Sequence, residues 1–257
     1  MRRLLTLLVT CHLSVISSTA QIGEHRSELA AGVNGGYAMT TVGFQPDVPQ
    51  DMHGGMTMGL TIRYTSEKYF NSICAIVGEV NYARMGWKER ILTLQDEPVI
   101  NNLTGEAEAY SRHVDYIQIP IFARLGWGRE RRGLQAFAQA GPQLAFCIGE
   151  STDANFDLTQ PNLQKRTSLV SSSVDRASNM YFMPVEKKFD YGIALGVGAE
   201  LSTKAGHFIV EGRYYYGLGN VYGSTKRDYF AISNYSTIYV KMTYLMDISK
   251  TNNDKIK

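Results

Sequence analysis

The amino-acid sequence predicts an all-β fold: an eight-stranded antiparallel up-and-down barrel that crosses a membrane. Eight segments alternate in side-chain type with a period of two, which indicates strands, because successive side chains of a strand point to opposite faces. The connections between these segments are short and long in strict turn. Long loops at one end, short turns at the other and an even strand count are typical of transmembrane β-barrels.

The first 20 residues have the features of a secretory signal peptide. A pair of arginines precedes an apolar run, and small residues before Gln21 suit a cleavage site. The run is too short for a membrane-spanning helix, which needs about 20 apolar residues. We therefore expect 1–20 to be a signal peptide and 21–257 to form a single barrel domain, with strands within 29–248 and a polar tail at 249–257.

The first four strands are expected at Leu29–Tyr37, Met56–Thr65, Ile73–Met85 and Val114–Leu125. In each of them a bulky apolar face opposes a smaller or more polar face. In the second strand, for example, Leu60 and Ile62 oppose Thr61 and Arg63.

The last four strands are expected at Leu134–Phe146, Phe189–Leu201, Phe208–Gly217 and Tyr235–Asp247. The sixth and seventh form a hairpin with a tight turn at Thr203–Gly206, and their bulky apolar face opposes one of small residues and charges. A membrane barrel turns its bulky face to lipid and encloses the polar one. A secreted soluble barrel, such as a lipocalin, would point the bulky face inward instead.

The connections assign the two ends of the barrel. The short ones are Ser66–Tyr69, Gly128–Gly133 and Thr203–Gly206, and the long ones are Ala38–Gly55, Gly86–His113, Cys147–Lys188 and Leu218–Asn234. Alternate connections of an antiparallel barrel lie at the same end, so every long loop is expected outside the cell and both termini in the periplasm. About 10 residues per strand, rising ~3.3 Å each and tilted ~40°, cover roughly 25 Å of membrane.

The inward face is expected to hold a charge network in the lumen. Its members are Arg63, Glu79, Arg124, Asp190, Glu200, Glu211, Arg213 and Lys241. Cations and carboxylates balance in this set, as a closed lumen requires, because an unpaired buried charge is costly. We expect Glu211, Arg213 and Lys241 to pair with either Glu79 or Glu200.

Composition excludes several other classes. The net charge of +2 gives no basis for nucleic-acid binding. The sequence has no metal-binding or phosphate-loop motif, so we expect no metal and no cofactor. Cys74 and Cys147 are predicted near opposite ends of the barrel, Cys147 at the external end of the fifth strand, and both are expected to be free thiols.

Four stretches resemble a known family: AAGVNGGYAMT, YIQIPIFARLGWG, FDYGIALGVGAEL and EGRYYYGLGNV. They are similar to the PorT-type outer-membrane β-barrel family of Bacteroidota. The resemblance implies an eight-stranded barrel in a Gram-negative outer membrane. The namesake of that family takes part in type IX secretion, which exports proteases and adhesins bearing a C-terminal sorting domain. The polar tail at 249–257 departs from the pattern.

The function expected from these features is non-enzymatic, and no catalytic residue is assigned. Side chains fill the interior of an eight-stranded barrel, so a diffusion pore is not expected. The barrel would be a binding or assembly platform in outer-membrane lipid, holding secretion-complex proteins through its periplasmic turns or external loops, of which Cys147–Lys188 is the natural choice. The alternative is a lipid-modifying hydrolase, for which Ser111, His113 and Asp115 share one face of the fourth strand.

Overall fold

The computed structural model describes residues 24–69, 72–93, 95–101, 104–129, 133–156, 183–223 and 230–250. The strands are β1 Glu24–Gln45, β2 Gln50–Asp51, β3 His53–Tyr69, β4 Ser72–Arg90, β5 Ala109–Gly128, β6 Gly133–Ala154, β7 Phe189–Ser202, β8 His207–Gly217 and β9 Ile232–Lys250. The predicted signal peptide lies outside the described residues, as do residues 251–257 of the predicted tail. No helix in the described ranges is long and apolar enough to cross a membrane.

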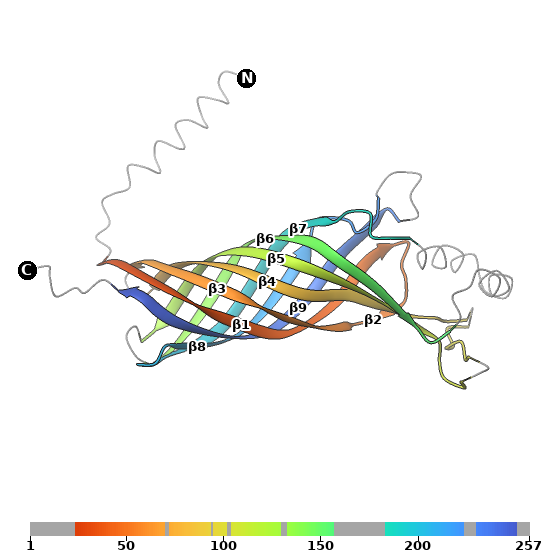
Figure 1. Ribbon diagram of the computed structural model, residues 1–257, viewed down its shortest axis with the longest axis horizontal. Helices are drawn as coiled ribbons and strands as arrows, with labels where there is room; N and C mark the ends of the chain where they lie inside the picture. Colours follow the sequence, from red (N-terminus) through yellow and green to blue (C-terminus); the bar gives the residue numbers. More distant parts are fainter. Residues whose placement is uncertain are drawn as a thin grey trace, which may run out of the picture.

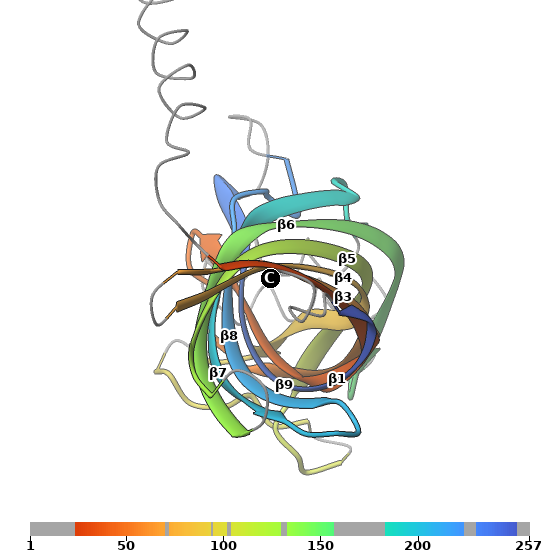
Figure 2. The same cartoon turned by 90° about the vertical axis from the view of Figure 1, so that its left-hand side faces the viewer.

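The eight long strands form one closed ring. Each pairs antiparallel with its neighbours in the sequence, and β1 pairs with β9 to close the barrel. The strands wind around a long cylinder that is closed in cross-section (Figures 1 and 2). The predicted eight-stranded up-and-down barrel is therefore confirmed, and the paired positions Glu28 and Lys250 place the beginning of β1 and the end of β9 at the same end.

The strands are longer than the sequence predicts. They extend over 11 to 22 residues, because the ladder continues into segments that were expected to be loops. The loop expected at Ala38–Gly55 is mostly strand and contains β2, which pairs with β4. At the other end, β9 takes in Ser249 and Lys250, which were expected in the tail. Cys147 lies at an irregularity within β6, not at its external end.

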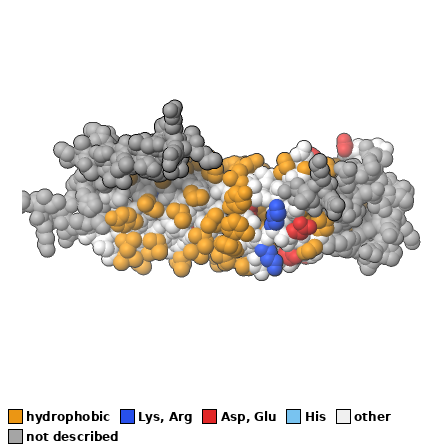
Figure 3. Space-filling model, turned by 90° about the horizontal axis from the view of Figure 1, so that it is seen from above, with side chains coloured by type: hydrophobic (Ala, Val, Ile, Leu, Met, Phe, Trp, Pro, Cys, Tyr) orange, Lys and Arg blue, Asp and Glu red, His pale blue; other side chains and the backbone are white. Residues whose placement is uncertain are grey.

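The two faces of the sheet have the orientation of a membrane barrel. Bulky apolar side chains point outward and are exposed, as Leu195 at 53% and Val197 at 65% illustrate. On the face seen from above, apolar side chains gather over the left and middle of the cylinder, and charged ones appear only toward the loop end (Figure 3). A secreted soluble barrel would have the opposite arrangement, so that alternative is wrong.

The hairpin between β7 and β8 fixes the register of the lumen side chains. Gly206 has φ of 140°, a left-handed conformation that favours glycine, and the N–H of Thr203 donates to its carbonyl at 2.9 Å. This turn places Gly198 opposite Glu211 and Gly196 opposite Arg213, as predicted. The space that a side chain would need at Gly198 and Gly196 is taken by Phe137 and Gln139 of β6, and not by the two charged side chains as predicted.

Candidate functional site

The middle of the lumen contains an ion-pair group around Glu79, which we call the Glu79 group: Glu79, Glu211, Arg213 and Lys241. Arg213 on β8 reaches Glu79 on β4 through both terminal nitrogens, at 2.9 and 3.0 Å. The ammonium of Lys241 on β9 lies 2.7 Å from the same carboxylate. Arg213 also pairs with Glu211, two residues before it on β8. All four side chains are buried, and their formal charges cancel.

Two neutral side chains add hydrogen bonds to the carboxylates of the Glu79 group. Asn81 donates to Glu79 at 2.7 Å, and Gln139 donates to Glu211 at 2.8 Å. The Arg213 guanidinium lies over the ring of Phe122, 4.4 Å from its centroid. Buried charges are tolerated when they are paired and also hydrogen-bonded, which holds for this group.

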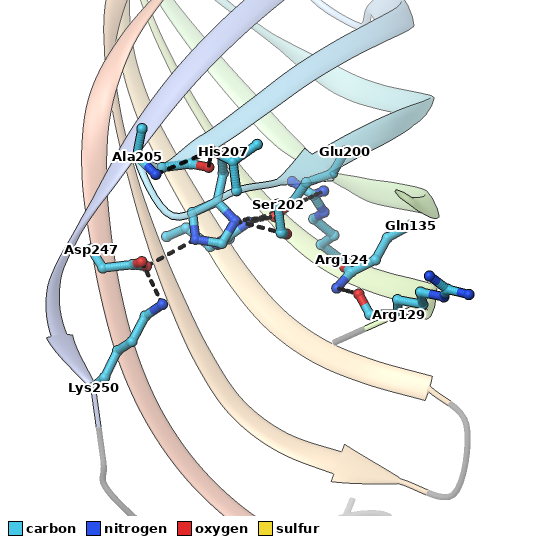
Figure 4. A network of polar contacts seen from close by, with 12 residues as sticks. Arg124, Arg129, Gln135, Glu200, Ser202, Ala205, His207, Asp247 and Lys250 are labelled. Carbon is cyan, nitrogen blue, oxygen red and sulfur yellow. Dashed lines mark hydrogen bonds and ion pairs between the residues drawn. The ribbon is translucent and has the colours of Figure 1, made fainter. Parts of the chain in front are cut away.

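A second group, the Glu200 group, lies at the end of the short turns and comprises Arg63, Arg124, Glu200 and His207. Glu200 accepts from Arg63 at 2.6 Å and is also paired with Arg124. Nδ1 of His207 lies 2.7 Å from Glu200. Figure 4 shows Arg124 and His207 converging on Glu200 from opposite sides. Three basic side chains therefore share one buried carboxylate.

His207 continues this group to the rim of the barrel. Its Nε2 lies 2.9 Å from Asp247, which also pairs with Lys250 at 2.5 Å. Nδ1 also lies 3.0 Å from the hydroxyl of Ser202 on β7, so the imidazole is held on both sides. The sequence prediction missed His207, although the alternation that selected Glu211 and Arg213 on β8 also places His207 on the inward face.

Asp190 is not part of either group. It accepts a hydrogen bond from the hydroxyl of Tyr215 at 2.7 Å. The expected balance of four cations against four carboxylates within one network is therefore wrong in this detail. Of the eight predicted lumen residues, all are buried and seven pair within the two groups. Glu79, and not Glu200, pairs with Arg213 and Lys241.

Above the Glu79 group, aromatic side chains fill the barrel toward the long loops. They are Phe44, Trp87, Tyr222 and Phe230, with ring centroids 4.7 to 6.4 Å apart. All four are buried, from β1, β4 and the segment that joins β8 to β9. This aromatic cluster is part of the larger of two cores of buried apolar residues.

Arg112 ties the segment before β7 across the mouth of the barrel. Its guanidinium donates to the carbonyl of Met183 at 2.5 Å and to Glu150 at 2.6 Å. Glu150 also accepts from the N–H of Val185 at 3.0 Å. Burial by itself would raise the pKa of Glu150, but these hydrogen bonds lower it below the ordinary value. Alternation along β5 places Arg112 on the same face as Arg124, a signal that the sequence prediction did not use.

The alternative catalytic residues do not form a triad. Nδ1 of His113 lies 2.6 Å from His53, and its Nε2 lies 2.9 Å from Asp153. Asp115 instead accepts from Arg84 at 2.9 Å and from the hydroxyl of Tyr82 at 2.7 Å. Asp115 is thus bound to Arg84 and Tyr82, and the three residues that the sequence grouped are not joined to one another by these contacts.

No set of three or more potential metal ligands is grouped in the part of the chain that the structure describes. Cys74 and Cys147 are both free thiols.

A match to a family model agrees with this architecture. Residues 19–223 match the family model described as outer membrane protein beta-barrel domain. No curated protein matches the chain. Among solved structures, Ail of Yersinia pestis is 12% identical to this chain with a TM-score of 0.34. The match covers 87% of this chain and 99% of Ail. OprG of Pseudomonas aeruginosa is 9% identical with a TM-score of 0.41, and the match covers 88% of this chain and 98% of OprG.

Neisserial surface protein A is 11% identical to this chain with a TM-score of 0.41, and the match covers 87% of this chain and 99% of that protein. The family model matches far more than half of the residues, and the closed ring with its apolar exterior is the fold that the family description names. The chain belongs to the outer membrane protein beta-barrel domain family, and it is an outer-membrane barrel.

Proposed function

We propose that this protein is a non-enzymatic platform of the outer membrane, whose filled barrel anchors external segments that hold partner proteins. The observation that supports this most directly is the filled interior. The Glu200 group, the Glu79 group and the aromatic cluster follow one another along the lumen. An interior occupied in this way serves stability rather than passage of solutes.

The extension of the strands beyond the apolar band supports a role on the outside of the cell. Outward charges begin at Arg84 on β4 and Asp115 on β5, which marks the upper limit of the apolar surface. From there β4 continues to Arg90, and β6 continues to Ala154. A rigid sheet that projects past the membrane positions its loops for contact with another protein.

The topology supports termini in the periplasm. The beginning of β1 and the end of β9 lie at the end of the short turns, as outer-membrane barrels with periplasmic turns have them. Protease added outside intact cells should leave a tag at residue 257 uncut and should cut a protease site inserted between Asp96 and Glu97, which are exposed in the connection from β4 to β5. Cleavage of the C-terminal tag under the same conditions would contradict this orientation.

The resemblance to the PorT-type barrels supports a role in type IX secretion as the specific form of the platform. The experiment is deletion of the gene followed by mass spectrometry of secreted proteins. Loss of those bearing the type IX sorting domain, restored by the intact gene, is the expected result. Unchanged export would leave the platform without this assignment, and affinity purification from solubilised outer membranes would then identify its partner.

Bilayer conductance tests the filled lumen separately. The refolded protein should give no steady conductance in planar bilayers and should migrate differently on gels before and after heating. A steady open conductance of the wild-type barrel would contradict a purely structural lumen. The Arg213→Ala barrel serves as the comparison, because it removes the side chain that crosses the lumen.

A further inference from the structure

The outer wall of the barrel has a groove of about 850 Å³ across β5 to β9. One row of directly paired residues runs along it: Leu125, Ala138, Val197, Gly212 and Val240. A parallel row lies two residues away on each strand: Ala123, Ala140, Leu195, Tyr214 and Ile238. We propose that this groove binds a hydrocarbon chain of an outer-membrane lipid as a defined site.

Small side chains create the groove. Ala123, Ala138 and Ala140 face outward on β5 and β6, and Gly212 faces outward on β8. A Cβ added at Gly212 would meet no atom within 4 Å. Larger outward side chains such as Val197 stand beside these positions. The wall is therefore recessed where most of the apolar band is filled with bulky residues.

The chemistry of the lining indicates hydrocarbon as the occupant. The outward residues that line the groove are all apolar apart from the hydroxyl of Tyr214, which bonds Ser236 at 2.9 Å. The polar residues behind it already have partners in the lumen: Gln139 bonds Glu211, and Arg213 bonds Glu79. On the outward side of the described lining, the hydroxyl of Tyr214 is therefore the polar group, and the rest of that side is hydrocarbon.

The dimensions also suit a lipid chain. Four strand spacings of ~4.8 Å give each row a length of roughly 19 Å. Since the strands tilt by ~40°, a row climbs roughly 12 Å through the membrane, which fits within the ~15 Å depth of one leaflet. The groove volume is also within the range of about 300–1,000 Å³ that is typical of ligand sites. The groove is continuous with the lipid-facing apolar band, so lipid has direct access to it.

The test is lipid retention measured by native mass spectrometry of the full mature barrel, released from nanodiscs of phosphatidylethanolamine. The wild type should retain one lipid at detergent concentrations that strip other bound lipid. Gly212→Leu should lower retention by roughly tenfold, because a leucine side chain fills the recess and removes on the order of ten van der Waals contacts of ~0.1–0.2 kcal/mol each with a bound chain. Ala138→Leu is a second variant with the same expectation.

Gly78→Leu is the matched control. Gly78 faces outward on β4 between Ile76 and Val80, and a Cβ added there also meets no atom within 4 Å, but it lies outside the groove. It should retain lipid like the wild type, and heat-dependent gel migration should show that all variants are folded. Equal loss in Gly78→Leu, or no lipid on the folded wild type, would overturn the proposal. A wild-type dimer that Gly212→Leu converts to monomer would also overturn it, by assigning the groove to a second copy.

Discussion

The guanidinium of Arg213 and the carboxylate of Glu79 meet across the lumen through two hydrogen bonds of 2.9 and 3.0 Å, although 134 residues separate them in the chain. The pair joins β8 to β4, strands that share no ladder and lie across the ring from one another. Lys241 binds the same carboxylate from β9. The Glu79 group thus ties three strands together from the inside of the barrel.

Arg213→Ala is expected to destabilise the barrel by about 3–5 kcal/mol, because it leaves Glu79 and Glu211 buried with too few cations. The measurement is the urea midpoint of the refolded barrel in detergent, followed by heat-dependent gel migration. Tyr214→Phe is the control on the next residue. The hydroxyl that this variant removes bonds Ser236 on the exposed face. The urea midpoint of Tyr214→Phe should therefore stay close to that of the wild type. Equally mild effects would show that Arg213 does not lie in the lumen.

Glu200→Gln is expected to cost about 3–5 kcal/mol as well, because Arg63, Arg124 and His207 lose the charge that they share. Asp115→Asn makes the same chemical change in the surface pair with Arg84, where exposed pairs contribute only about 0.2–1 kcal/mol. Urea midpoints of both variants check the prediction. A Glu200→Gln barrel as stable as Asp115→Asn would contradict the burial of the Glu200 group.

Stability should fall as the pH is lowered from about 6.5 to 4, through His53. Burial, the neighbouring His113 and Arg84 lower the pKa of His53 to about 4. Between the two values the unfolded chain binds a proton that the folded barrel excludes, so acid favours unfolding. Above the ordinary pKa both states are neutral, and below 4 both are protonated, so the loss is confined to this window and amounts to at most ~3 kcal/mol.

Unfolding midpoints at several pH values, compared with those of His53→Gln, measure this contribution. The variant lacks the titrating group, so its stability should depend less steeply on pH within the window. Parallel pH profiles of the two barrels would refute the assignment. At pH 8 the comparison reports only the loss of the 2.6 Å contact with His113.

Cys74 and Cys147 should both react as free thiols in the unfolded mature chain. Cys74 pairs with Leu125 and Cys147 pairs with Tyr116, nine positions apart along β5. At ~3.3 Å per residue this is roughly 30 Å, far beyond the ~7 Å limit for a disulfide. Mass mapping after alkylation without reductant should find both residues modified. An intramolecular disulfide would contradict the register of β4 to β6.

The amino-acid sequence determines which face of each strand lies inside. Alternation is a local property, and a shift of one residue would expose every charge to lipid, so Glu79, Arg124 and Arg213 are placed in the lumen by pattern alone. The same alternation places His207 and Arg112 on the inward face. The prediction missed both, because it began these two strands at Phe208 and Val114, after the two residues. The upper limits of the strands were less predictable, because outside the membrane the ladder continues through polar residues whose alternation is weak.

Only the tertiary structure decides which inward side chains meet. Partners such as Arg63 and Glu200 lie 137 residues apart, and their heights in the lumen depend on the register of every ladder between them and on closure through β1 and β9. Asp190 has the right alternation but lies beside Tyr215, beyond the reach of the cations of the two groups. The outer groove arises in the same way, because alanines and a glycine that are scattered along the chain become neighbours only when five strands are placed side by side.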